Sequence, residues 1–246
     1  MEAFADTDIG LCRSTNQDEF YYSLEPVGNL PNLFMVADGM GGHNAGDFAS
    51  KYTIETMKSI IQMDLLKTPE QIFHNAIRRV NRMLFDKAAQ DSSLKGMGTT
   101  LVAATVVGEE LIVANVGDSR LYVIEEGMRQ ITQDHSYVEE MVRKGRMERG
   151  SAEYMEKKNM ITRAIGVFSA VQPDYFRITL WKNSRILLCT DGLSNMVPED
   201  VMLQILQGEG SVENKVKALI ELARENGGSD NITALLIDRQ GRKYSC

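Results

Sequence analysis

The chain has 246 residues, of which 43% are hydrophobic and 25% are charged, and these proportions exclude collagen-like, low-complexity and intrinsically disordered chains. The net charge is −7 and there is no Lys- or Arg-rich block, so we expect no nucleic-acid partner. No apolar run reaches the roughly 18 residues that a membrane-spanning helix needs, so we expect no membrane partner either.

Short apolar runs of strand length recur along the chain, and most are bounded by Gly, Asp or Asn. Their length and their β-branched residues are typical of strands. Gly108-Glu109 separates two of the runs and predicts a hairpin between them. The predicted strands are a weaker one at 20–23 and clear ones at 33–37, 100–107, 110–116, 120–124, 176–180, 186–189 and 232–237.

Three longer segments carry apolar residues at helical spacing. The first covers 49–60. The second begins at Thr68, because Thr68 can cap a helix, Pro69 suits its first position and Gln71 completes the start signal. The third follows Ser211. Strands and helices each come in clusters, which favours an α+β layered fold over a regular βαβ alternation.

The stretch 136–159 is rich in charged residues and poor in apolar ones. Val138, Met141 and Val142 predict a short helix within it. We interpret this stretch, at about 136–160, as a surface subdomain or lid. No repeat, Pro-rich linker or change of composition divides the rest of the chain, so the sequence predicts a single domain over 1–246.

Aspartates stand where the predicted strands begin or end. One such aspartate is typical of an ordinary turn beside a strand. If the strand ends converge at one edge, the carboxylates lie together and stay ionised only beside cations. Oxygen ligands, with three histidines in all, favour Mg²⁺ or Mn²⁺ over zinc. The aspartates are Asp18, Asp38, Asp118, Asp191 and Asp230.

A glycine-rich turn follows Asp38 and runs to Gly46. It is not a P-loop, because Asp47-Phe48 stands where Lys-Ser/Thr is required. It is not a dinucleotide fingerprint, because Asn44 occupies the position of the third glycine. The turn therefore indicates a close approach of the backbone to a ligand, and its leading acid suits metal ligation by a carboxylate and a carbonyl.

The cysteines bear on the cellular compartment. Cys12, Cys189 and Cys246 include no C-x-x-C pair, which argues against a disulfide framework and against a cysteine zinc site. Their small, odd number is typical of a reducing compartment. We therefore expect a cytoplasmic protein.

A series of short motifs resembles the bacterial metal-dependent (type 2C) serine/threonine protein phosphatases. The motifs follow one another in the family's order and cover the chain from about residue 3 to 238. They are Arg13-x-x-Asn-Gln-Asp18, Val36-Ala-Asp-Gly-Met-Gly-Gly-His43, Gly98-Thr-Thr100, Val116-Gly-Asp-Ser-Arg120, Asp134-His135, Ile161-Thr-Arg-Ala-Ile-Gly166, Thr190-Asp-Gly-Leu193 and Ser229-Asp-Asn-Ile-Thr233.

The resemblance implies a central β-sandwich of two antiparallel sheets flanked by helices, in four layers, with a flap subdomain. It implies two Mn²⁺ or Mg²⁺ ions per chain. Asp38 would bridge them and the Gly39 carbonyl would ligate one, while Asp191 and Asp230 would hold the other. Asp118 would serve a third, weaker metal site. Asp18 would support the metal ions through bound water. Arg13 would be the phosphate clamp.

The chain departs from the family pattern at two positions. Gln17 stands where many members have Glu. Met40 stands where eukaryotic members have a histidine that is proposed as the general acid. His43 lies three residues further on and could act as the acid or could cap the following helix, and a metal-bound water is the alternative acid.

The resemblance implies hydrolysis of phosphoserine and phosphothreonine in proteins by a metal-bridging hydroxide, without a phosphoenzyme. The expected partners are phosphorylated proteins and a cognate bacterial Ser/Thr kinase, and the expected state is a monomer. Two alternatives stay open. One is a catalytically silent, phosphatase-like binding module, and the other is a hydrolase of small phosphomonoesters.

Overall fold

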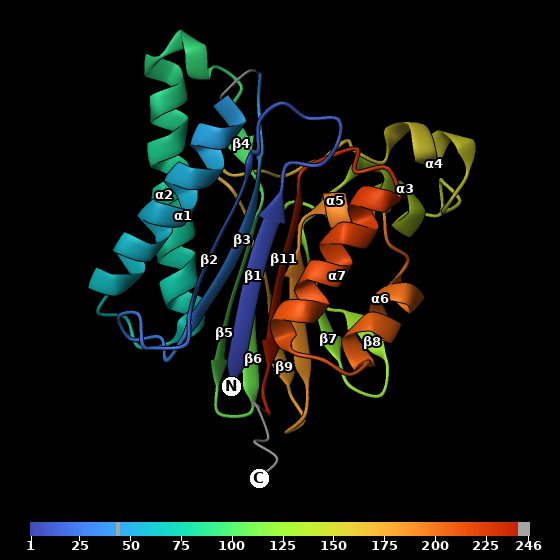
Figure 1. The fold of residues 1–246 in the computed structure, drawn as a ribbon. Coiled ribbons are helices and arrows are strands. Elements are labelled where there is room, and N and C mark those ends of the chain that lie inside the picture. The colour runs from blue at the N-terminus through green and yellow to red at the C-terminus, as the bar shows by residue number, and fades with distance from the viewer. Residues whose placement is uncertain (43–44, 241–246) are drawn as a thin grey trace.

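Two antiparallel sheets pack face to face in the computed structural model, which describes residues 1–42 and 45–240 (Figure 1). In strand order, the first sheet contains β1 (Glu2–Asp8), β11 (Ile232–Asp238), β10 (Arg185–Cys189), β7 (Arg120–Ile124) and β8 (Met128–Gln130). The second contains β2 (Asp18–Ser23), β3 (Leu33–Met40), β5 (Leu101–Val107), β6 (Glu110–Val116) and β9 (Asp174–Thr179), with β4 (Gly98–Thr99) paired to β3.

Helices cover the outer faces of both sheets (Figure 1). The long helices α1 (Ala45–Met63) and α2 (Pro69–Gln90) lie over the second sheet, and α1 packs directly on β3. The first sheet is covered by α6 (Glu199–Gln207) and α7 (Val212–Glu225), and α7 contacts β1 and β11. The four layers confirm the predicted α+β β-sandwich flanked by helices.

The central strands are buried on both faces. In β3, Met35 and Ala37 pack against the helices α1 and α2, whereas Phe34 and Val36 pack between the two sheets. This division follows from the two-residue period of a strand. It explains why the run at 33–37 is apolar throughout instead of alternating.

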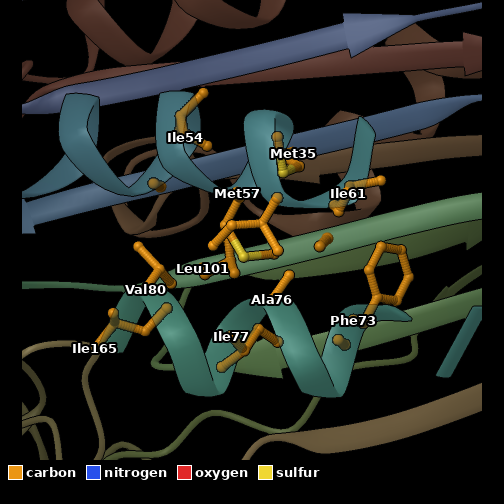
Figure 2. Close-up of a cluster of buried hydrophobic side chains, with 14 of the residues drawn as sticks. Met35, Ile54, Met57, Ile61, Phe73, Ala76, Ile77, Val80, Leu101 and Ile165 are labelled. Atoms are coloured by element: carbon orange, nitrogen blue, oxygen red, sulfur yellow. The ribbon is translucent and has the colours of Figure 1, made fainter. Parts of the chain in front are cut away.

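The core under α1 and α2 is an apolar cluster. Figure 2 shows Met57 of α1 and Ala76 of α2 pointing toward each other beside Leu101 of β5. Burial of such side chains contributes about 25 cal/mol per Å² of apolar surface. This cluster fixes α1 on the sheet, and the first turn of α1 lies next to the C-terminal end of β3, where Gly39 approaches Gly46.

The charged stretch at 136–160 carries two short helices, α3 (Tyr137–Arg143) and α4 (Ala152–Lys157). They project from one end of the sandwich (Figure 1). Backbone hydrogen bonds join the two ends of the stretch: Tyr137 N donates to Met160 O at 2.7 Å, and Thr162 N donates to His135 O at 2.7 Å. We call residues 136–160 the flap segment.

The predicted strands and the four predicted helical segments are present, with ends that differ by a few residues. The sequence analysis missed β1, β4, β8, the 3-10 turn η1 (Ser92–Leu94), α4, α5 (Asp191–Ser194) and α6. Several of these are very short, and β1 mixes acids with few apolar residues. No helix within residues 1–42 and 45–240 is long and apolar enough to cross a membrane.

Candidate active site

The predicted aspartates meet at one end of the sandwich. A cavity of about 230 Å³ opens there, and four of them line it together with Arg13 and Gly39. Asp38 comes from the end of β3 and Asp118 from the loop after β6, whereas Asp191 begins α5 and Asp230 precedes β11. The two sheets therefore each supply part of the wall. Gln17, Met40, Gly41, Thr100, Asn159 and Ile161 complete the lining of this acidic cavity.

Asp38 is fixed through its backbone by two threonines. Asp38 N donates to Thr100 Oγ1 at 2.9 Å, and Thr99 Oγ1 donates to Asp38 O at 2.9 Å. The Thr100 hydroxyl also hydrogen-bonds to Ser119 Oγ at 2.7 Å. Because Ser119 follows Asp118, this buried contact ties the loops that carry Asp38 and Asp118 to each other.

Asp18 lies behind the acidic cavity, opposite Asp38 in the β2–β3 ladder, and it is buried. Its Oδ2 accepts hydrogen bonds from Thr190 Oγ1 at 2.8 Å and from Thr233 Oγ1 at 2.7 Å. A hydroxyl has a single proton. The 2.7 Å contact between Thr7 and Thr233 is therefore donated by Thr7, and every hydroxyl of the network is oriented toward the carboxylate.

Turns with little free space bring the aspartates of the first sheet together. A Cβ on Gly192 would lie 2.0 Å from Asn231 O, so the backbone next to Asp191 touches the backbone next to Asp230. A Cβ on Gly39 would lie 2.0 Å from Gly46 O, at the start of α1. Such close backbone approach requires glycine at both positions.

Asn231 positions the loop that carries Arg13. Its Oδ1 accepts from Gln17 N at 2.8 Å, and its Nδ2 donates to Ile9 O at 2.9 Å and to Thr15 O at 3.1 Å. Arg13 then reaches Asp230, with Nη2 donating to Oδ2 at 2.7 Å. This ion pair raises the pKa of Arg13, so the guanidinium is a permanent positive charge at the acidic cavity.

Burial and mutual repulsion act on the carboxyls. Desolvation, reinforced by the neighbouring carboxylates, raises the pKa of Asp118 to about 8 and that of Asp38 well above its ordinary value. The pKa of Asp18 rises to about 7, chiefly through burial. Burial and the charge of Asp230 raise the pKa of Asp191 as well. Positive charge in the cavity would relieve this repulsion.

The donor set fits hard divalent cations. Within residues 1–42 and 45–240, Asp18 Oδ1 and Asp191 Oδ1 are buried without a hydrogen-bond partner, and the cavity is lined by four carboxylates and by no His or Cys. Carboxylate and carbonyl oxygens are the ligands that Mg²⁺ and Mn²⁺ prefer. In the same described residues, no three His, Cys, Asp or Glu side chains form a ready-made metal-ligating group, so the carboxylates share a cavity without converging on one point.

The structure places most of the predicted site residues at this cavity. Arg13, Asp38, Gly39, Asp118, Asp191 and Asp230 line it, and Asp18 supports it from behind. His43 lies outside the described residues. Sequence reasoning gave no role to Thr7, Thr190, Thr233 or Asn231. The signal available was that Thr190, Asn231 and Thr233 belong to the motifs around Asp191 and Asp230.

A family model, "Protein phosphatase 2C", matches residues 9–232. The chain is 40% identical over 244 residues to "Serine/threonine phosphatase stp" of Listeria welshimeri, a match that covers 97% of this chain and 96% of the relative. It is 33% identical over 241 residues to "Protein phosphatase PhpP" of Streptococcus pneumoniae, covering 96% and 97% of the two chains.

Solved structures give the same result. The Mycobacterium tuberculosis serine/threonine phosphatase PstP/Ppp superposes with a TM-score of 0.87 at 33% identity, covering 96% of this chain and 97% of that chain. A structure of the PstP catalytic domain in complex with two manganese ions superposes with a TM-score of 0.84 at 32% identity, with the same coverage.

Proposed function

The chain belongs to the protein phosphatase 2C family, and we propose that it hydrolyses phosphoserine and phosphothreonine in proteins, with divalent cations held in the acidic cavity. The family and the class of enzyme agree with the prediction from the sequence. The observation that carries the proposal is the gathering of four aspartates, from segments far apart in the chain, around one cavity beside Arg13.

Two Mn²⁺ or Mg²⁺ ions are the proposed cofactors. The two manganese ions in the PstP structure support Mn²⁺. Asp38 and the Gly39 carbonyl would hold one ion, Asp191 and Asp230 the other with Asp38 shared, and Asp118 a third, weaker site. Such ions would activate water and neutralise charge on the phosphoryl group. Asp18 would support the ions through bound water, because its Oδ1 is buried next to the other aspartates and has no hydrogen-bond partner among the described residues.

Arg13 is the proposed clamp for the phosphoryl group. A guanidinium can pair with two phosphoryl oxygens at once. The side chain of Arg13 is 53% exposed, and it forms an ion pair with Asp230. Once Asp230 serves as a cation ligand, Arg13 can turn its donors to the substrate. His43 stays a candidate for the acid that protonates the leaving group.

We further propose that the substrates are phosphorylated proteins that a cognate Ser/Thr kinase modifies, that the chain acts as a monomer, and that it works in the cytoplasm. The names of the bacterial relatives support the substrate class. Every aspartate expected for a working site is present, which argues against a silent binding module.

The proposal is tested by assaying a phosphothreonine peptide and a small phosphomonoester side by side, with Mn²⁺, with Mg²⁺ and with a chelator. We expect metal-dependent hydrolysis and a clearly higher kcat/KM for the peptide. Equal or better turnover of the small ester would favour a small-molecule hydrolase. No turnover by folded, metal-loaded protein would favour a binding module.

A further inference from the structure

A second, larger cavity lies under the flap segment. Its volume is about 550 Å³. One wall is formed by α3 and by Arg149. The other wall is formed by the loop after β8, by Thr162 and Arg163, and by Asp174 at the start of β9. The residues that line this flap cavity and matter below are Arg120, Asp134, Glu139, Glu140, Arg143, Arg149, Arg163 and Asp174.

The flap cavity adjoins the acidic cavity. A small hollow of about 50 Å³ lies between them. It shares Arg120, Asp134 and Ser136 with the flap cavity, and it shares Asp118 and Asp191 with the acidic cavity. A peptide spans about 3.3 Å per residue when extended, so residues close to a phosphoserine in the acidic cavity can reach the flap cavity.

Most charges of the flap cavity are matched within the fold. Arg120 pairs with Asp134 at 2.7 Å, and Arg163 pairs with Asp174 at 2.8 Å. Arg149 pairs with Glu139 at 2.7 Å. Glu139 also accepts from the Tyr154 hydroxyl at 2.8 Å, so this pair joins α3 to α4 and stiffens the wall.

Arg143 is the exception. Its neighbour Glu140 is engaged by Lys144 at 2.5 Å, and that ion pair lowers the pKa of Glu140, with only a lesser effect from Arg143. Among the residues that the structure describes, Arg143 has no carboxylate partner within 4.0 Å, although it lines the cavity. Among the described residues that line the cavity, four arginines face four carboxylates, and Arg143 is the arginine without an ion pair.

We propose that the flap cavity is a recognition subsite for an acidic side chain of the substrate peptide, and that Arg143 determines this preference by pairing with the Asp or Glu carboxylate. The inference rests on the proposed phosphatase function and adds the sequence context of its substrates. The neighbouring cavity that holds the aspartates is acidic. An arginine without an ion pair in the flap cavity gives an acidic substrate an attractive contact that the aspartates cannot supply.

The test is a charge exchange between enzyme and peptide. A phosphothreonine peptide with neutral flanks is compared with variants that carry a single Glu, or a single Lys, at each flanking position. In the wild type we expect Glu at one or two positions to raise kcat/KM by up to about fivefold, the effect of one solvent-accessible ion pair. Arg143→Gln should abolish this preference, so that the Glu peptides and the neutral peptide have the same kcat/KM. Arg143→Glu should reverse the preference, so that the Lys peptides have the higher kcat/KM.

Arg146→Gln is the matched control, because Arg146 is an exposed arginine of the same flap segment that is not among the residues lining the cavity. It should keep the preference for Glu. The inference is overturned if Arg143→Gln keeps the wild-type ratio, if Arg146→Gln loses it equally, or if no position favours Glu.

Binding of the same peptides, measured by fluorescence anisotropy, separates this inference from the proposed function. If nothing is hydrolysed but Glu peptides still bind more tightly to the wild type than to Arg143→Gln, the subsite stands and the phosphatase proposal fails. If peptides are hydrolysed without any dependence on Arg143, only the subsite fails.

Discussion

At the scale of single residues, Asp18 shows how the fold prepares a buried carboxylate. Two threonine hydroxyls donate to its Oδ2, while its Oδ1 has no hydrogen-bond partner in the described part of the chain. The donated hydrogen bonds offset part of the desolvation cost. One oxygen is thereby held in place and the other is left for an interaction with the proposed cation site.

We expect Thr233→Val to weaken Mn²⁺ binding, because it removes one of the two donors that orient Asp18. Loss of such an outer-shell contact typically costs about 10–100-fold in metal affinity. Isothermal titration calorimetry on the metal-free protein measures this directly, without relying on turnover. Thr233→Ser keeps the hydroxyl and should bind Mn²⁺ like the wild type. Equal affinity of the Val variant would show that the network has no part in metal binding.

His135 gives a prediction about pH. Its Nδ1 accepts from Gly117 N at 3.1 Å, so Nε2 carries the proton and donates to Asp174 Oδ2 at 3.0 Å. Burial, together with the nearby Arg163, lowers the pKa of His135, although Asp174 opposes the shift. The neutral ring is therefore the form that the fold favours.

The pKa of His135 is lower in the folded than in the unfolded state. The contribution of His135 to the unfolding free energy is therefore complete above the unfolded pKa of about 6.5, and it is lost as the pH falls through the folded pKa. We expect the unfolding free energy of the wild type to fall below pH 6.5 more steeply than that of His135→Gln. Urea denaturation at several pH values measures both curves. Parallel curves would contradict this assignment.

At the scale of elements, the strands of the sandwich interior could be predicted, whereas β1 and β8, the edge strands of the first sheet, could not. The run at 33–37 is apolar because it is buried on both faces, which gives a strong signal. Strand β1 lies at a sheet edge and is half-buried along most of its length, so its sequence reads as a loop. The helix α5 has four residues, too few for any periodicity.

The contact between α5 and the turn before β11 yields a further prediction. Gly192→Ala would place a Cβ 2.0 Å from Asn231 O, which forces Asp191 and Asp230 apart. We expect a loss of about 1–3 kcal/mol in unfolding free energy, as for other overpacked sites, and weaker Mn²⁺ binding. Gly127→Ala is the control, because a Cβ there meets nothing within 4 Å. If Gly192→Ala behaves like this control, the close packing does not set the position of the aspartates.

At the scale of the whole molecule, the acidic cavity is a product of the packing of the two sheets. Asp38 belongs to one sheet, and Asp191 and Asp230 adjoin strands of the other. The apolar layer between the sheets, which includes Phe34 and Leu188, holds the two groups of carboxylates at the same cavity. A cation that binds only the folded chain would then add to the stability of the entire sandwich.

The packing of the two sheets also explains which residues of the site could be predicted from the sequence. The aspartates were accessible from the sequence, because each stands beside a strand and within a recognisable motif. The roles of the threonines and of Asn231 were not, because they depend on pairings such as Asp18 with Thr190 and Thr233, which lie 172 and 215 positions away. The flap cavity likewise exists only through the fold.

The central claim is that the acidic cavity holds the divalent cations on which phosphate hydrolysis depends. The most direct test combines Mn²⁺ calorimetry and phosphothreonine peptide hydrolysis on the wild type, Asp38→Asn and Asp191→Asn. Asp200→Asn, an exposed change in α6, is the control. We predict two Mn²⁺ ions bound to the wild type and to the control, and loss of both binding and hydrolysis in the two cavity variants. Full Mn²⁺ binding or undiminished hydrolysis in Asp38→Asn would contradict the claim.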